Sequence, residues 1–411
     1  RPEESAEAVV RENEYRKHLE RYEELYQAGR FSEALRQLKE AREIPGFERR
    51  EQLRDAWAKL YCLPREGFAA CWKVWSFRCG SAPVETARIS SDGRFALTGC
   101  SDHGSSYSMT LWDLASRTCV RAFSGHHAQI NAIDMSDDGR LLLSASSDHT
   151  ARIWETSSGD CLWELTGHTA EVNTACFSPD GLLAASGSAD GTIKLWDIAT
   201  GRCLNTLKGH PGNILDMCIS SDGCKLFSAC NKNTIKIWDV YKGKCLKTLN
   251  GEKGVPYLLT TWENGYYFFS VSFGREGWPS EFRVWNIDDG TGAFSFSGHK
   301  GDVHSVAAIE NFYALTAGDK GTLRLWDITS GWGGPVYTFP QSAVDLKTVS
   351  VSANGRYALI GDGDGMLHLW ELEWKIAERE QSDWDDSALP YLRKFPRFYV
   401  SELKNTPKVS K

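Results

Sequence analysis

Short segments rich in β-branched and aromatic residues alternate with turn residues over most of the chain. Around the middle of the sequence, four such segments follow one another at residues 172–178, 182–188, 192–198 and 202–207. Turn residues separate them, namely Pro179-Asp180-Gly181, Asp190-Gly191 and Thr200-Gly201. These residues favour tight turns because they tolerate left-handed or preset backbone angles. The pattern therefore predicts four consecutive antiparallel strands.

The same plan recurs along the chain, and tryptophan marks the third segment of each copy. These tryptophans are Trp112, Trp154, Trp196, Trp238, Trp285, Trp326 and Trp370. A fixed period of about 40 residues is typical of proteins that repeat one supersecondary unit radially or in a line. Seven copies of a four-stranded unit predict an all-β protein whose role is to bind rather than to catalyse.

Paired residues open and close the copies. Gly-His occurs at 125/126, 167/168, 209/210 and 298/299, with Gly251-Glu252 in the same register, and Trp-Asp or a relative closes every copy. The run GSADGTIKLWD at residues 187–197, with Gly167-His168 before it, resembles the WD-repeat β-propeller family. The resemblance covers roughly residues 72–371. It implies a seven-bladed β-propeller in which each blade is a four-stranded antiparallel sheet.

A polar network inside the blades is expected from the spacing of these residues. The indole N–H of a buried tryptophan needs an acceptor, and a hydroxyl ten residues earlier can accept it and bond to the imidazole of Gly-His. The turn Asp can then fix the imidazole tautomer. Two blades carry complete tetrads: His126, Ser144, Asp148, Trp154 and His168, Ser186, Asp190, Trp196. Two carry three members each: His210, Ser228, Trp238 and His299, Thr316, Trp326.

Blade five departs most from this pattern, with Glu252 in place of the histidine, and three other blades also depart from it. Lys232 and Lys320 stand where blades four and six should carry the turn Asp, although Asp319 is next to Lys320. Blade seven has no Gly-His and places Ile360 at the hydroxyl position. These blades are expected to be less rigid. Insertions lengthen one turn each in blade one, at residues 100–108, and in blade five, at residues 272–282.

A serine, a histidine and an aspartate brought together are also the components of a hydrolase triad. The same triple recurs in two blades at the same spacing and is joined each time to a buried tryptophan, so a structural role is favoured. The sequence contains no P-loop, dinucleotide fingerprint or HExxH motif. We therefore expect no catalytic residues, no enzyme activity and no cofactor.

Charge and cysteine content narrow the class of partner and the compartment. A net charge of −7 weighs against nucleic-acid binding, which needs a basic face. No apolar run is long enough to span a membrane, and no signal peptide precedes the repeats. The 12 cysteines include no C-x-x-C pair, so no metal is expected. Cys119, Cys161, Cys203 and Cys245, at the start of fourth strands, are expected to act as small apolar residues. A reducing cytoplasm is the expected compartment.

The repeats are flanked by segments that read as helical. Residues 1–62 predict a helical hairpin, at 12–26 and 32–41, followed by a third helix at 48–60, and residues 26–41 resemble half of a tetratricopeptide unit. Residues 63–78 form a linker and then, at 72–77, the closing strand of blade seven. Residues 79–371 hold the seven repeats, and residues 372–411 predict a helical tail centred on 382–400. The chain starts at Arg1 rather than Met, which suggests a piece of a longer protein or a processed product.

The flanks carry a second resemblance. An Ile-Pro-Gly break at residues 44–46, the WELEW strand at 370–374 and the DWDD-x-A-x-PYL segment at 383–392 are similar to the C-terminal portion of large bacterial WD-repeat signalling proteins. In those proteins the propeller follows a Ser/Thr kinase domain or a signal-transduction ATPase. The resemblance implies a sensor or scaffold role, with an upstream domain of the same polypeptide as one candidate partner.

The WD-repeat resemblance also implies where a partner would bind. In these propellers the narrow face is the usual docking surface, and it is formed by residues beside the first apolar position of strand one and before the turn Asp. Carried onto this chain, the positions are Glu85, Gln129, Asn131, Ser147, Glu171, Asn173, Ala189, Asn213, Leu215, Asn231, Val255, Tyr257, Asp302, His304, Asp319, Asp345 and Lys347. In blade five, Arg275 and Trp278 either extend over this face as a binding hot spot or pack on their own blade.

Two hypotheses follow from this acid- and amide-rich set. The first is a non-catalytic protein-protein interaction scaffold or sensor that binds a basic or hydrogen-bond-rich peptide segment. The alternative is an intramolecular regulatory module that keeps an upstream kinase or ATPase inactive until a ligand displaces it.

Overall fold

The structure is a computed structural model of the 411-residue chain. It describes residues 2–27, 34, 36–38, 40, 41, 44, 65–101, 107–250, 255–261, 267–272, 280–287, 290–299, 301–309, 313–327 and 334–376. The chain divides into two compact units, which are considered separately below. Residues 69–373 form one unit, and residues 1–68 with 374–411 form the other.

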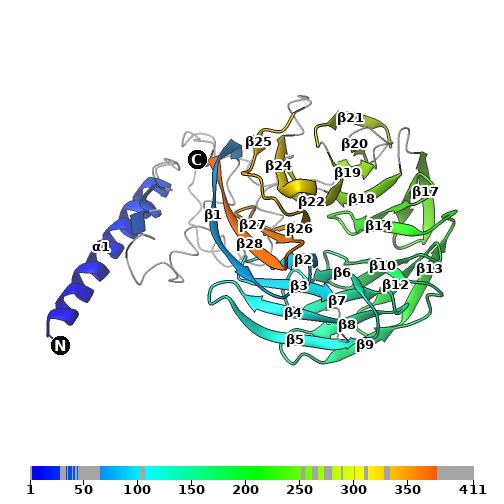
Figure 1. Ribbon diagram of the computed structural model, residues 1–411, viewed down its shortest axis with the longest axis horizontal. Coiled ribbons are helices and arrows are strands. Elements are labelled where there is room, and N and C mark those ends of the chain that lie inside the picture. Colours follow the sequence, from blue (N-terminus) through cyan, green and yellow to red (C-terminus); the bar gives the residue numbers. More distant parts are fainter. Residues whose placement is uncertain are drawn as a thin grey trace, which may run out of the picture. The chain divides into compact units, whose positions relative to one another are not determined.

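The larger unit consists of seven four-stranded antiparallel sheets, the blades, arranged around a common axis (Figure 1). Blade one comprises β2 (Val84–Ile89), β3 (Phe95–Ser101), β4 (Tyr107–Asp113) and β5 (Thr118–His126). Blade two comprises β6 (Ile130–Met135), β7 (Leu141–Ser146), β8 (Ala151–Glu155) and β9 (Cys161–Leu165). Blade three comprises β10 (Val172–Phe177), β11 (Leu183–Ser188), β12 (Thr192–Asp197) and β13 (Cys203–Lys208).

The remaining four blades follow the same order. Blade four comprises β14 (Ile214–Ile219), β15 (Lys225–Cys230), β16 (Thr234–Asp239) and β17 (Lys244–Asn250). Blade five comprises β18 (Pro256–Thr261), β19 (Tyr267–Ser272), β20 (Glu281–Asn286) and β21 (Gly292–Ser297). Blade six comprises β22 (Val303–Ile309), β23 (Tyr313–Gly318), the short 3-10 helix η1 (Asp319–Gly321), β24 (Thr322–Asp327) and β25 (Tyr337–Thr338). Blade seven comprises β26 (Leu346–Val351), β27 (Tyr357–Asp362), β28 (Met366–Ile376) and β1 (Arg65–Arg78).

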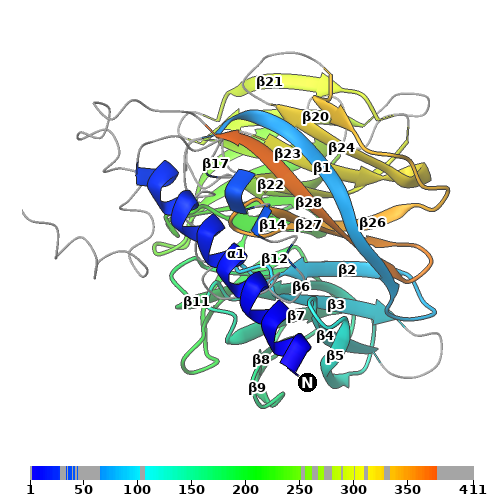
Figure 2. The ribbon, with the colours of Figure 1, turned by 90° about the vertical axis from the view of Figure 1, so that its left-hand side faces the viewer.

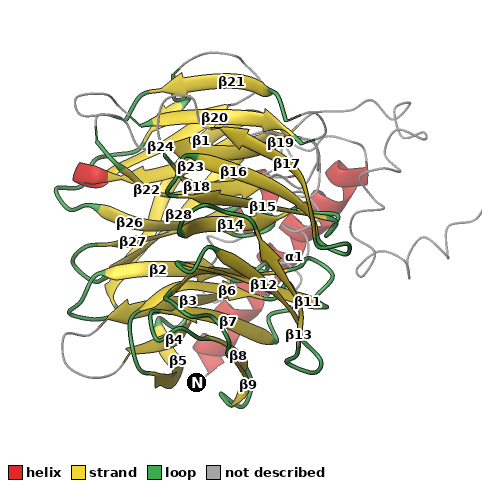
Figure 3. Ribbon diagram, turned by 90° about the vertical axis from the view of Figure 1, so that its right-hand side faces the viewer, coloured by secondary structure: helices red, strands yellow, loops and turns green. Residues whose placement is uncertain are grey.

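The two ends of this unit close the ring. β1 pairs with β28, so blade seven takes its outer strand from residues that precede blade one (Figure 1). The first strand of blade seven also contacts the first strand of blade one. The strand expected at residues 72–77 begins earlier, at Arg65. The predicted seven-bladed β-propeller is confirmed, and Figure 3 shows its strands, in yellow, joined by loops and turns.

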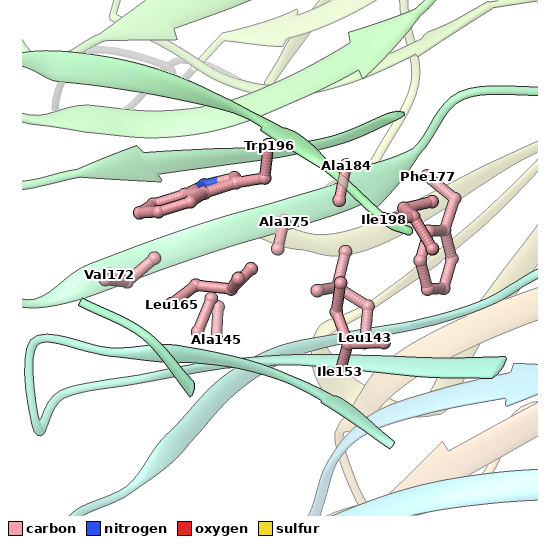
Figure 4. Packing of buried hydrophobic residues seen from close by; sticks show 11 residues of the cluster. Leu143, Ala145, Ile153, Leu165, Val172, Ala175, Phe177, Ala184, Trp196 and Ile198 are labelled. Atoms are coloured by element: carbon pink, nitrogen blue, oxygen red, sulfur yellow. The ribbon is translucent and has the colours of Figure 1, made fainter. Parts of the chain in front are cut away.

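The apolar core lies between neighbouring blades. Between blades two and three, Leu143 and Ile153 from one sheet meet Ala175 and Trp196 from the next (Figure 4). Trp196 is 3% exposed. A tryptophan buries about 150–250 Å², which corresponds to about 4–6 kcal/mol of gross apolar burial. This explains why one tryptophan per repeat is the most regular feature of the sequence.

Polar side chains join the innermost strands of adjacent blades. Because each first strand is an edge of its own sheet, its outward N–H groups need acceptors from elsewhere. Hydroxyl and carboxylate oxygens of a neighbouring blade supply them: Thr348 Oγ1 to Ala87 N (3.1 Å), Ser305 Oγ to Val349 N (3.1 Å), Asp134 Oδ2 to Phe177 N (2.9 Å) and Asp216 Oδ2 to Leu259 N (2.8 Å). Burial raises the pKa of Asp216 to about 6, although the hydrogen bonds that its carboxylate accepts from Leu259, Met217 and Thr174 act to lower it.

The smaller unit contains α1 (Pro2–Gln27), short helical pieces between residues 34 and 41, and the ends of β1 and β28 at residues 65–68 and 374–376. The helix α1 is longer than the helix expected at residues 12–26, and Figure 2 shows it as one continuous helix. Tyr15, Tyr22 and Leu25 are buried. His18 Nδ1 lies 3.0 Å from Gln37 Oε1, which ties α1 to the second helical segment of the hairpin. The expected third helix at 48–60 and the helical tail at 382–400 lie outside the described residues. No described helix is long and apolar enough to cross a membrane.

Candidate interaction face

The polar network of blade three shows how a blade is held together internally. Trp196 Nε1 donates to Ser186 Oγ at 2.8 Å, and Ser186 Oγ lies 2.8 Å from His168 Nε2. His168 Nδ1 lies 3.0 Å from Asp190 Oδ2. Burial lowers the pKa of His168 despite the opposing effect of Asp190, so the imidazole is neutral at pH 7. The proton therefore stays on Nδ1, facing Asp190, while Nε2 accepts the Ser186 hydroxyl.

The carboxylate at the end of this network is ionised. Burial alone would raise the pKa of Asp190, but hydrogen bonds from Thr192, Thr169 and His168 outweigh it and bring the pKa to about 2. Blade two has the same arrangement, with His126 Nδ1 2.7 Å from Asp148 Oδ2 and Nε2 2.7 Å from Ser144 Oγ. Trp154 Nε1 donates to that hydroxyl at 2.9 Å.

Blades four and six lack the carboxylate partner. His210 Nε2 lies 2.6 Å from Ser228 Oγ, which also accepts the Trp238 indole N–H at 2.8 Å. Burial, with a smaller effect of Lys236, lowers the pKa of His210 to about 4.

In blade six the imidazole has hydroxyl partners. His299 Nε2 lies 2.7 Å from Thr316 Oγ1, which accepts the Trp326 indole N–H at 2.8 Å, and His299 Nδ1 lies 3.1 Å from Thr322 Oγ1. Burial, aided by Arg324, lowers the pKa of His299 to about 3. Asp319, which the sequence places beside the turn position, pairs with His304 instead.

Two blades contain a tryptophan acceptor that the ten-residue spacing missed. Trp112 Nε1 donates to Thr98 Oγ1 at 2.9 Å, and Trp285 Nε1 donates to Ser270 Oγ at 2.8 Å. These hydroxyls stand 14 and 15 residues before their tryptophans, because the insertions of blades one and five lie between the two strands. Adding the insertion length to the spacing would have identified both residues.

The cysteines at the start of the fourth strands do not behave as expected. Cys119, Cys161, Cys203 and Cys245 are all exposed. The fourth strand is the outer edge of each blade, so its first residues face solvent rather than the neighbouring sheet. The sequence predicts that these cysteines act as small apolar residues, but their exposure shows that they do not contribute to the apolar core.

The residues assigned to the narrow face from the sequence differ in exposure. Five of them are exposed: Glu85, Gln129, Glu171, Asn213 and Asp302. We call these five residues the loop face, because they lie in the loops that enter each first strand or at the first positions of that strand. Twelve are partly buried: Asn131, Ser147, Asn173, Ala189, Leu215, Asn231, Val255, Tyr257, His304, Asp319, Asp345 and Lys347. Arg275 and Trp278 lie outside the described residues.

Several of the partly buried residues use their polar atoms to hold neighbouring blades together. Asn131 Nδ2 donates to Val172 O at 2.9 Å, and Asn173 Nδ2 donates to Ile214 O at 2.7 Å. The Tyr257 hydroxyl donates to Val303 O at 2.5 Å. Each acceptor is the first residue of the next blade. These side chains therefore align adjacent blades, a role that the sequence analysis did not assign to them.

His304, Asp319 and Asp345 form the one group in the described chain whose ligand atoms could hold a metal ion, with these atoms within 4.8 Å of one another. His304 Nε2 lies 2.8 Å from Asp319 Oδ1. Asp345 accepts the Lys320 N–H at 2.8 Å, and its other oxygen lies 3.7 Å from Lys347 Nζ. Because an ammonium group already faces this carboxylate, we assign the cluster to the joint between blades six and seven rather than to a metal.

The repeated part of the chain matches a known family. The family described as IFT122 first beta-propeller matches residues 83–371. A relative, Nuclear distribution protein PAC1 of Arthroderma otae, is 34% identical over 71 residues, which are 17% of this chain and 14% of the relative. The chain thus aligns with only a small part of that relative's length.

Proposed function

Because the chain belongs to the IFT122 first beta-propeller family, whose propeller is of the WD-repeat type and so commonly a scaffold for protein interactions, we propose that its propeller binds a protein or peptide partner at the loop face. The partner segment is basic or rich in hydrogen-bond donors. Binding at the loop face is non-catalytic, the compartment is the cytoplasm, and neither nucleic acid nor membrane is a partner.

The exposure and chemistry of the loop face support this proposal. Glu85, Glu171 and Asp302 provide three exposed carboxylates, and Gln129 and Asn213 provide two exposed amides. The side chains beside them, such as Asn131 and Asn173, are occupied by bonds between blades. A partner would therefore meet acceptor groups at the entrances of the first strands, which favours lysine, arginine and amide side chains.

Charge reversal on the loop face tests the proposal. We would compare the wild-type chain with a Glu171→Lys/Asp302→Lys variant by affinity capture from lysate and quantitative mass spectrometry. The matched control is Asp137→Lys/Asp160→Lys, which makes the same change of charge. Asp137 and Asp160 are exposed and lie in the turns between strands one and two and between strands three and four, at the opposite ends of the strands.

A partner retained by the control and lost by the loop-face variant would support binding at this face. A partner retained equally by both variants would place the interaction elsewhere and contradict the proposal. Because the two variants carry the same net charge, a general effect of charge on solubility or capture cannot produce the first outcome.

The flanking motifs favour a second candidate function. The segments similar to large bacterial signalling proteins favour a propeller that engages an upstream kinase or ATPase domain of the same polypeptide through this same face. In that case a longer gene product should gain basal activity when it carries Glu171→Lys/Asp302→Lys. Unchanged activity would count against the intramolecular role while leaving binding of a separate partner open to the capture experiment.

A further inference from the structure

Blade seven contains a serine, a histidine and an aspartate in one hydrogen-bonded line. His368 on β28 places Nδ1 2.7 Å from Ser76 Oγ on β1, and Nε2 3.0 Å from Asp362 Oδ2 at the end of β27. His368 stands two residues before Trp370, at the strand position that Arg152 and Lys194 occupy in blades two and three. Ser76 and His368 are 292 residues apart in the sequence, so no local motif reveals the arrangement.

The hydrogen bonds of Asp362 set the direction of the whole line. Asp362 Oδ1 accepts the N–H groups of Asp364 and Met366, each at 2.9 Å, so the carboxylate is anchored in the turn. Its other oxygen accepts the proton on His368 Nε2. The lone pair on Nδ1 then accepts the Ser76 hydroxyl at 2.7 Å, with Lys73 Nζ as a second, more distant donor at 3.4 Å. A serine whose hydroxyl donates to an imidazole oriented by a carboxylate is arranged as an activated nucleophile.

The protonation state of His368 agrees with that role. Burial lowers the pKa of His368, and Lys73 lowers it further against the opposing effect of Asp362. The imidazole is therefore neutral at pH 7. A general base needs this state before the reaction begins.

Exposure separates this line from the tetrads of blades two and three. Ser144 and Ser186 are 0% and 1% exposed, and each already accepts a tryptophan N–H. Ser76 is exposed, and the His368 side chain is 13% exposed. A small molecule can therefore reach the Ser76 hydroxyl, whereas the tetrad hydroxyls are sealed inside their blades.

Lys73 adds a positive charge at the same place. Its Nζ lies 3.4 Å from His368 Nδ1 and 5.5 Å from the ring centre of Trp370. The indole face holds the ammonium near the serine through a cation–π contact. A negative charge that develops on a carbonyl oxygen during attack by Ser76 would form close to this ammonium.

We propose that Ser76 is a nucleophilic site that accepts the acyl group of a small ester. Ser76 Oγ bonds to the carbonyl carbon and its proton passes to His368 Nδ1. The bond between that carbon and the ester oxygen then breaks, and the alcohol leaves with the proton from Nδ1. Water attacks the acyl-serine in the same way, releasing the acid and restoring the Ser76 hydroxyl and the neutral imidazole. This activity would be additional to partner binding at the loop face.

A fluorophosphonate probe tests the nucleophile directly. Ser76 Oγ would bond to phosphorus, fluoride would leave, and the proton would pass through His368 to solvent. We would measure the labelling rate of the folded chain, locate the label by peptide mass spectrometry, and follow the hydrolysis of p-nitrophenyl acetate in parallel. We expect the label on Ser76. Ser76→Ala should abolish labelling, and His368→Gln should slow it by about 100-fold or more, as for loss of a general base.

Ser124→Ala is the matched control, because Ser124 is also an exposed serine on the fourth strand of a blade. It should leave labelling and ester hydrolysis unchanged. Unfolding the wild-type chain in guanidinium should remove the reactivity of Ser76. This experiment tests the hydrogen-bonded line without any variant whose folding is in question. The proposal would be overturned if Ser76 were labelled no faster than Ser124. It would also be overturned if a folded His368→Gln variant were labelled at the same rate as the wild type. The line would then be a structural substitute for the missing tetrad.

Discussion

Replacing Ser186 by alanine should destabilise blade three by more than the loss of one hydroxyl suggests. The Ser186 oxygen accepts the Trp196 indole N–H at 2.8 Å, and its own proton goes to His168 Nε2 at 2.8 Å. In Ser186→Ala, a buried donor and a buried acceptor both lose their partner. Each unsatisfied buried group costs about 1–3 kcal/mol, so the expected loss in the free energy of unfolding is about 2–6 kcal/mol.

Blade five offers a matched variant with half of this network. Ser270 Oγ accepts the Trp285 indole N–H at 2.8 Å, and no histidine among the described residues bonds to it. Ser270 is 1% exposed, as is Ser186, so burial is the same at the two sites. Ser270→Ala leaves one buried donor without a partner, and we expect a loss of about 1–3 kcal/mol.

Guanidinium unfolding would measure the global change, and hydrogen exchange of the β11 and β12 amides would show whether blade three opens first. We expect Ser186→Ala to lose clearly more stability than Ser270→Ala and to speed exchange mainly in blade three. A loss below about 0.5 kcal/mol, within the range of ordinary surface substitutions, would refute the idea that the tetrad is a connected network. So would an equal loss in the two variants.

Three further predictions follow from individual contacts. The pKa of His210 is about 4 in the folded protein, below the unfolded value of about 6.5. Acid therefore favours the unfolded chain, and the free energy of unfolding falls as the pH drops from about 6.5 towards 4. Between pH 7.5 and 5, urea unfolding should show that the free energy of unfolding falls by about 1–2 kcal/mol less in His210→Gln than in the wild type. Gly201 and Gly181 both have a φ of +68°, but a Cβ on Gly201 would lie 2.5 Å from the Trp163 ring while one on Gly181 meets nothing within 4 Å. Gly201→Ala should therefore lower the thermal midpoint more than Gly181→Ala and shift the tryptophan fluorescence, because Trp163 must move; similar midpoints would contradict the contact. Arg356 and Glu371 form a buried pair with N–O distances of 2.9 and 2.8 Å, so Arg356→Met should cost about 3–5 kcal/mol in denaturant unfolding, whereas Arg356→Met/Glu371→Leu should recover much of that loss; equal losses would argue against an uncompensated buried charge.

The repeated part of the fold could be predicted from the sequence, because each repeat contains the residues that indicate its strands, its turns and its buried tryptophan. The tetrads of blades two and three could be placed for the same reason, since all four members lie within one period. Thr98 and Ser270 were missed because insertions changed the spacing to their tryptophans.

Contacts between repeats could not be predicted in the same way. Asn131 and Asn173 were assigned to partner binding, but each donates to a carbonyl 41 residues later that only the curvature of the ring brings close. The line from Ser76 to Asp362 depends on ring closure, which joins the two ends of the propeller. Exposure of the fourth-strand cysteines likewise follows from their place at the outer edge of the blades rather than from residue type.

Selection of peptides from a displayed random library on the immobilised chain would test the central claim most directly. We expect the selected sequences to be enriched in lysine and arginine, to bind the Asp137→Lys/Asp160→Lys variant as tightly as the wild type, and to lose binding to Glu171→Lys/Asp302→Lys. Peptides without basic residues, or peptides that bind the loop-face variant as well as the wild type, would contradict recognition of a partner by the acidic and amide groups of this face.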